Sequence, residues 1–128
     1  MVNDTVADSL NRMKTHEQVG KKECVIQASK LMKEILKILQ SHNYVGAYEL
    51  FEEGHSRLFR VELIGKINKC SAIKPRFPIK KEEWTKWEQQ YIPAMGFGLL
   101  IASTPKGLMT NKEAKEQGTG GRLIAYIY

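Results

Sequence analysis

Apolar residues recur at helical spacing in two segments of the first half of the chain. Between Asp4 and about Glu17 they fall at intervals of three and four, which predicts an amphipathic helix. From Lys30 to about Ser41 they form a wider stripe, and Ser29 stands where a helix start needs a side-chain cap. The first half therefore carries two helices, each with one face available for a core.

Strand patterns lie between and after these helices. Residues 23–28 form a short, β-branched run that predicts one strand. Residues 44–51 and 58–64 are separated by residues 52–56, and the second run alternates apolar with charged positions. This period of two indicates a hairpin with one buried face. Helix, strand, helix and hairpin together predict a small N-terminal α/β module over residues 1–66.

Residues 67–128 are predicted to form a second module, mostly β with short helices. Residues 82–92 indicate a short helix, and residues 96–102 indicate a buried strand. Thr110-Asn111-Lys112-Glu113 is a capping box that starts another helix, and residues 122–128 predict a final strand. The intervening segment 65–81 is a linker that admits only an edge or bent strand, because of its prolines. The fold class is therefore α+β, with two small α/β modules.

The basic excess is concentrated in the second module. The chain has a net charge of +6, of which residues 1–66 contribute +1 and residues 67–128 contribute +5. Such a balance favours a polyanionic partner without saying which one. The hydrophobic content of 42% is enough to bury a core, so the chain is expected to fold.

Patterns typical of other classes of protein are weak. The sequence shows neither an apolar run of membrane-spanning length nor a leader peptide, so we expect a cytoplasmic protein without a membrane partner. Cys24 and Cys70 lack zinc-ligand spacing and are expected to be reduced, buried thiols, and the three histidines lie in separate elements. We therefore expect neither a metal nor another cofactor. Ser103 lacks the glycine-flanked turn of a nucleophilic serine, so neither an enzyme nor a small-molecule substrate is expected.

One helix face carries three aromatic residues, Trp84, Trp87 and Tyr91. A stacking platform for nucleic-acid bases is one interpretation of this spacing. Packing in the core is the other interpretation, and we favour it because large aromatic rings usually supply buried area.

Residues suited to RNA gather in the C-terminal quarter, in two predicted turns that flank the short helix. Hydroxyls there both donate and accept, a lysine supplies a point charge, and glycines let a backbone approach a partner closely. Double-helical RNA presents 2′-hydroxyls and phosphates along a shallow minor groove, which such groups match. Ordinary turn residues remain the alternative explanation. The candidates are Ser103, Thr104, Lys106, Gly107, Thr119, Gly120, Gly121 and Arg122.

Further candidates lie outside that quarter. Lys30 stands beside the free amides of a helix start, where anions bind. Asn11 and Arg12 lie on the exposed face of the first helix. Lys74 and Arg76 belong to a basic run without acids, for which RNA contact and simple solvation are weighed equally.

Several motifs together resemble a known family. They are Ser103-Thr104-x-Lys106-Gly107-x-Met109-Thr110, Glu113-Ala114-Lys115 and Gly120-Gly121 at the C-terminal end, with Val6-Ala7-Asp8-x-Leu10-x-Arg12 and Ala28-Ser29-Lys30 at the other. This set looks like the universal small-subunit ribosomal protein eight family. The runs Gly65-Lys66-Ile67-Asn68-Lys69-Cys70 and Lys74-Pro75-Arg76-Phe77-Pro78 are similar to its archaeal/eukaryotic-type branch, and the short chain with its plain tail favours an archaeal source.

The resemblance implies a non-enzymatic constituent of the small ribosomal subunit. Such proteins bind an irregular helix in the central domain of small-subunit ribosomal RNA and support assembly of the platform, beside neighbouring ribosomal proteins. The C-terminal module is expected to supply most contacts, and the N-terminal module to touch an adjacent backbone. The family usually has a serine where this chain has Pro105, so Ser103 and Thr104 are expected to carry more of the contact. An RNA-binding translational regulator acting off the ribosome is the alternative.

Overall fold

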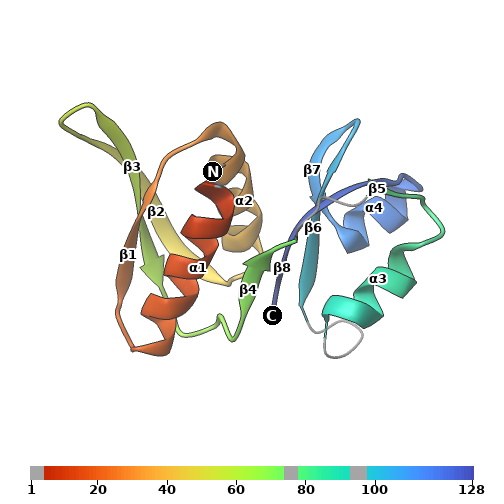
Figure 1. The fold of residues 1–128 in the computed structure, drawn as a ribbon, viewed down its shortest axis with the longest axis horizontal. Helices are drawn as coiled ribbons and strands as arrows, with labels where there is room; N and C mark the ends of the chain where they lie inside the picture. Colours follow the sequence, from red (N-terminus) through yellow and green to blue (C-terminus); the bar gives the residue numbers. More distant parts are fainter. Residues whose placement is uncertain (1–4, 74–77, 93–97) are drawn as a thin grey trace. The chain divides into compact units, whose positions relative to one another are not determined.

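The chain divides into two units, each with its own antiparallel sheet (Figure 1). The structure is a computed structural model, and it describes residues 5–73, 78–92 and 98–128. The units are Met1–Asn68 and Lys69–Tyr128, whereas the sequence analysis places the division after Lys66. Both units combine helices with strands, which confirms the predicted α+β class.

The first unit packs two helices on one side of a three-stranded sheet, as Figure 1 shows. The strand order is β1-β3-β2, and both pairings are antiparallel. The long β2–β3 hairpin extends beyond the helices. The elements are α1 (Thr5–Gln18), β1 (Glu23–Gln27), α2 (Lys30–Ser41), β2 (Val45–Glu53) and β3 (Ser56–Leu63).

Local chemistry fixes the bounds of α2. The Ser29 side chain accepts a hydrogen bond from the Met32 amide at 3.1 Å, so the predicted cap is confirmed. Past the other end, Asn43 has a φ of +63°, a left-handed conformation that asparagine tolerates better than most residues. The centre of its apolar stripe is fully buried and consists of Met32, Ile35, Leu36 and Leu39.

The second unit is built around its final strand, β8, which pairs with β6 on one side and with β4 and β5 on the other. β7 pairs with β6 and forms the far edge. Pro78 lies in β5, at an edge, where a missing amide costs no ladder bond. The elements are β4 (Cys70–Ala72), β5 (Pro78–Ile79), α3 (Trp84–Tyr91), β6 (Leu99–Thr104), β7 (Gly107–Thr110), α4 (Asn111–Gln117) and β8 (Gly121–Ile127).

Helices α3 and α4 cover one face of this sheet (Figure 1) and share a core with it. Trp84 is 1% exposed within that core, which confirms the packing interpretation for this ring. Trp87 and Tyr91 pack against the same core but stay partly exposed. The predicted cap of α4 is also confirmed, since the Thr110 side chain accepts a hydrogen bond from the Glu113 amide at 3.3 Å and donates one to the Glu113 carboxylate at 3.3 Å.

One local prediction is wrong. The sequence analysis ends the buried strand at Ala102 and places Ser103 and Thr104 in a turn, but both belong to β6. The strand continues because Ser103 and Thr104 pair with Leu108 and Gly107 of β7, a strand that the sequence analysis does not predict.

Candidate nucleic-acid interface

The tip of the β6–β7 hairpin is a two-residue turn, Pro105–Lys106, closed by the pair Thr104 and Gly107. The Thr104 hydroxyl donates to the Gly107 carbonyl at 2.8 Å and accepts from the Lys106 amide at 3.2 Å. Thr104 is only 8% exposed. Its hydroxyl is therefore bonded within the turn, where it fixes the backbone that carries Lys106.

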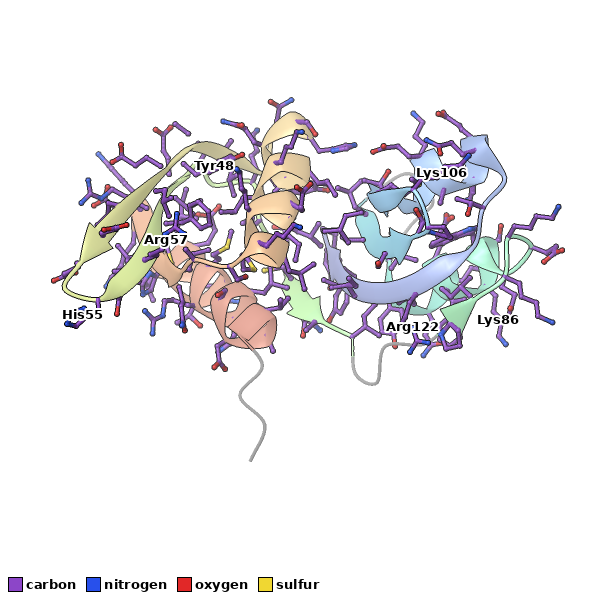
Figure 2. All side chains as sticks on the ribbon, turned by 90° about the horizontal axis from the view of Figure 1, so that it is seen from above. Tyr48, His55, Arg57, Lys86, Lys106 and Arg122 are labelled. Atoms are coloured by element: carbon purple, nitrogen blue, oxygen red, sulfur yellow. The ribbon has the colours of Figure 1, made fainter. Side chains whose placement is uncertain are left out.

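Pro105, Lys106 and Gly107 are all exposed at this tip. Gly107 has a φ of +112°, and a Cβ atom placed there would meet nothing within 4 Å. The backbone is thus open on that side, but the left-handed conformation favours glycine. Figure 2 shows the labelled Lys106 at the surface of the module.

A second group of candidates lies on the strands behind the tip. Ser103 of β6 pairs directly with Arg122 of β8, and Arg122 pairs in turn with Pro78 of β5. Residues directly opposite each other in an antiparallel pair project from the same face, with Cβ atoms about 5 Å apart. Both Ser103 and Arg122 are exposed, so a hydroxyl and a guanidinium lie side by side in solvent.

The paired glycines Gly120 and Gly121 are required by the packing of the unit itself. A Cβ atom on Gly120 would lie 2.3 Å from the carbonyl oxygen of Ile79. A Cβ atom on Gly121 would lie 2.6 Å from the carbonyl oxygen of Ser103 and 3.0 Å from the Thr104 methyl group. The space that the missing side chains leave is therefore occupied by neighbouring strands of the same unit.

The turn before β8 is anchored by the two helices. Gly118 ends α4 with a φ of +64°, and the amides of Gly118 and Thr119 bond back to the last helical turn. Trp84 of α3 donates its indole N–H to the Thr119 carbonyl at 3.0 Å. The ion pair between Glu88 and Lys115 joins α3 to α4. Thr119 thus holds the start of β8 in place, and its hydroxyl bonds to the Gly120 carbonyl at 3.1 Å.

These contacts sort the C-terminal candidates into two exposed groups on the sheet of the second unit. One group is the tip, Lys106 with Gly107, and the other is the strand pair, Ser103 with Arg122. Figure 2 shows Lys106 and Arg122 on separate parts of the module. The buried or internally bonded candidates position these two groups; they are Thr104, Thr119, Gly120 and Gly121.

In the first unit, Lys30 lines a cavity of about 420 Å³ at the start of α2. Lys33 and Arg57 line the same cavity, with Tyr48, and so add two cations that the sequence analysis did not select. The strand period of two could have indicated Arg57, because it lies two residues before Phe59 in β3 and therefore projects from the same face of the strand as that buried ring. Tyr48 and Arg57 are both labelled in Figure 2.

Asn11 and Arg12 are exposed on α1, away from the Lys30 cavity. Arg12 donates to the Val25 carbonyl at 3.2 Å and lines a separate cavity of about 330 Å³ with Asp8 and Gln27. Lys74 and Arg76 lie outside the described residues.

The described part of the chain gives little support for a metal site, a membrane-spanning helix or a reactive thiol. There, no group of histidine, cysteine and acidic side chains is arranged to hold a metal ion. No helix among the described segments is long and apolar enough to cross a membrane. Burial raises the pKa of the Cys24 thiol to about 11, which keeps it protonated and weakly nucleophilic at neutral pH.

Comparison with known families gives a match over almost the whole chain. The model of the family described as Ribosomal protein S8 matches residues 4–128, and it therefore covers both units and every candidate residue discussed above.

Proposed function

The chain belongs to the ribosomal protein S8 family and is thus an rRNA-binding protein of the small ribosomal subunit, and we propose that it binds an irregular helix in the central domain of small-subunit rRNA. The family is one of structural ribosomal proteins, which bind rRNA and other ribosomal proteins in translation. We propose the same non-enzymatic role here, in cytoplasmic ribosomes, where binding supports assembly of the platform.

The observation that carries the proposal is the pairing of Ser103 with Arg122 in the same unit as the exposed Lys106–Gly107 tip. A guanidinium binds phosphate through a fixed fork of N–H groups, and a neighbouring hydroxyl can both donate to and accept from a 2′-hydroxyl. Lys106 adds a point charge for another phosphate. Residues 69–128 carry 10 basic and 5 acidic residues, so the long-range field also attracts RNA.

We assign direct contacts to Ser103, Lys106, Gly107 and Arg122. The positioning residues Thr104, Thr119, Gly120 and Gly121 hold these groups on strands and a closed turn, which suits recognition of RNA by shape. Secondary contacts to an adjacent backbone are assigned to Lys30, Asn11 and Arg12, with Lys74 and Arg76 in the basic run.

We further propose that the chain belongs to the archaeal/eukaryotic-type branch. The support is the sequence of two runs, Gly65 to Cys70 and Lys74 to Pro78.

Hydroxyl-radical footprinting on small-subunit rRNA tests the proposal. We expect the full-length protein to protect one irregular helix of the central domain. The variant that combines Ser103→Ala with Lys106→Gln should lose that protection. Lys112→Gln is the matched control, because Lys112 is also exposed in this unit but belongs to neither group. Equal affinity for the rRNA helix and for duplex DNA at the same salt concentration would refute the proposal. Tight binding to its own messenger RNA without rRNA protection would favour the off-ribosome regulator.

A further inference from the structure

Four aromatic rings form a continuous stack at one end of the second unit. We call Trp87, Tyr91, Tyr126 and Tyr128 the aromatic ladder. Its successive centroids are 6.3, 5.3 and 6.3 Å apart, and its interplanar angles are 13°, 30° and 21°. The first two rings come from α3, the third comes from β8, and the last directly follows β8. All four remain partly exposed, in contrast to the buried Trp84 of the same helix.

A cavity of about 330 Å³ opens against three rings of the ladder. Its lining combines Tyr91, Tyr126 and Tyr128 with the side chains of Lys69, Gln89 and Gln90. A site for a small organic group occupies roughly 300–1,000 Å³, so a single nucleotide is within range. The two amides carry both donors and acceptors, the groups that read the edge of a base. No acidic side chain is present among the described residues that line this cavity.

Positive charge stands at two points along the ladder. The Lys69 ammonium nitrogen is 6.0 Å from the centroid of Tyr126, and the Lys86 ammonium nitrogen is 5.6 Å from that of Trp87. Figure 2 shows Lys86 at the surface of the unit. Rings that offer a stacking face, together with cations, are the combination by which proteins hold single-stranded nucleic acid.

We propose that the aromatic ladder binds an unpaired base of RNA, which stacks on the tyrosine rings while Lys69 contacts its phosphate. This inference rests on the proposed rRNA-binding function and adds a second ligand, a single-stranded nucleotide, to the helix bound elsewhere. The ladder and the strand pair are separate sites, because Tyr126 packs against the core of the unit whereas Arg122 is exposed, and a register shift in the β6–β8 pair lies between them.

Titration of the full-length protein with hexauridylate and hexaadenylate, followed by tryptophan fluorescence, tests the ladder. Tyr126→Leu removes the central ring but keeps apolar volume, and it should weaken binding by roughly five- to a hundredfold, the range for loss of one stacked base. Lys69→Gln leaves every ring in place and should lower the salt slope by about 0.7, the value for one phosphate contact on a single strand. Lys112→Gln should leave both quantities unchanged.

Two further measurements make the test independent of whether one variant folds. A thermal melt shows whether Tyr126→Leu is folded. If it is not, the Lys69→Gln titration and an ultraviolet crosslink test the proposal instead. Ultraviolet crosslinking of hexauridylate should label the peptide that contains Tyr91 or the one that contains Tyr126. Wild-type affinity in the folded variants, or labelling confined to other peptides, would overturn the proposal. Variants that bind the oligonucleotides normally but fail to enter the small subunit would instead indicate a protein neighbour on the ladder, and would also overturn it.

The ladder and the hairpin tip can be separated. Tyr126→Leu should keep its affinity for a blunt-ended irregular RNA helix, whereas Lys106→Gln should lose affinity for that helix and keep it for hexauridylate. Loss of helix binding in Lys106→Gln together with unaltered oligonucleotide binding in the ladder variants would leave the proposed function intact and refute the ladder alone.

Discussion

Replacing Thr104 by valine should loosen the hairpin tip without changing its shape. Valine keeps the β-branch that suits a strand but removes the hydroxyl bonded to the Gly107 carbonyl at 2.8 Å and the Lys106 amide at 3.2 Å. Each such hydrogen bond contributes about 1 kcal/mol to stability. Because Lys106 and Gly107 are exposed, water can replace the lost partner, so we expect a total loss of about 1–2 kcal/mol.

Urea unfolding and calorimetric titration with the irregular rRNA helix measure the two consequences. The free energy of unfolding should fall by about 1–2 kcal/mol in Thr104→Val. The affinity for RNA should fall by up to about tenfold, since about 1.4 kcal/mol of ordering free energy corresponds to that factor. Thr104→Ser keeps the hydroxyl and should restore both. The exposed Ser103 is the comparison: Ser103→Ala should weaken binding while stability stays within about 0.5 kcal/mol of the wild type.

Either of two results would refute this reasoning. If Thr104→Val lost stability but bound RNA like the wild type, the tip would not be part of the interface. If it lost RNA affinity at unchanged stability, its hydroxyl would contact RNA directly, and the bonding within the turn would not matter.

Three other predictions address packing, charge and the thiol. Gly121→Ala should lower the free energy of unfolding by about 1–3 kcal/mol, because its Cβ would press on the Ser103 carbonyl. The urea midpoint should fall accordingly, and an unchanged midpoint would contradict that contact. Lys106→Gln should reduce the salt slope of binding to the rRNA helix by about one, against no change in Lys112→Gln; an unchanged slope would exclude a phosphate contact. Iodoacetamide at pH 8 should label Cys24 slowly in the native protein and quickly in urea, since burial raises its pKa to about 11, and rapid native labelling would argue against burial. The contribution of Cys24 to stability should also decline as pH rises from 9.0 to about 11, because the unfolded chain releases the thiol proton first.

Sequence reasoning worked best where the signal was local. Ser29 bonds to the amide three residues on, and Thr110 does the same with Glu113, so the caps of α2 and α4 could be predicted from spacing alone. β7 is only four residues long and shows no alternation, and β4 is three residues long. Such strands exist because of their partners in β6 and β8, and a pairing between distant segments leaves no periodic trace in the short partner.

The candidate residues could be selected from the sequence, but their individual roles could not. Whether the Thr104 hydroxyl faces a partner or closes its own turn depends on the β6–β7 register. Likewise, a glycine that gives space to RNA and one that gives space to a neighbouring carbonyl look the same in a sequence, and Gly121 is of the second kind. Only part of the aromatic ladder could be predicted from the sequence. The spacing within α3 places Trp87 and Tyr91 on one face, whereas Tyr126 stacks on Tyr91 only because β8 lies beside α3.

The central position of β8 sets an order of events during synthesis. All three strands of the first unit lie within residues 23–63, so that sheet can close while the ribosome is still translating the second unit. In the second unit, β4 and β5 must wait for residues 121–127 to find their partner, whereas β6 can first pair with β7 and then with β8. The proposed RNA surface depends on that sheet, since Ser103 meets Arg122 only across the β6–β8 pair. A nascent chain therefore acquires the proposed pair of Ser103 and Arg122 only after β8 has been translated, whereas the Lys106–Gly107 tip needs only the β6–β7 hairpin.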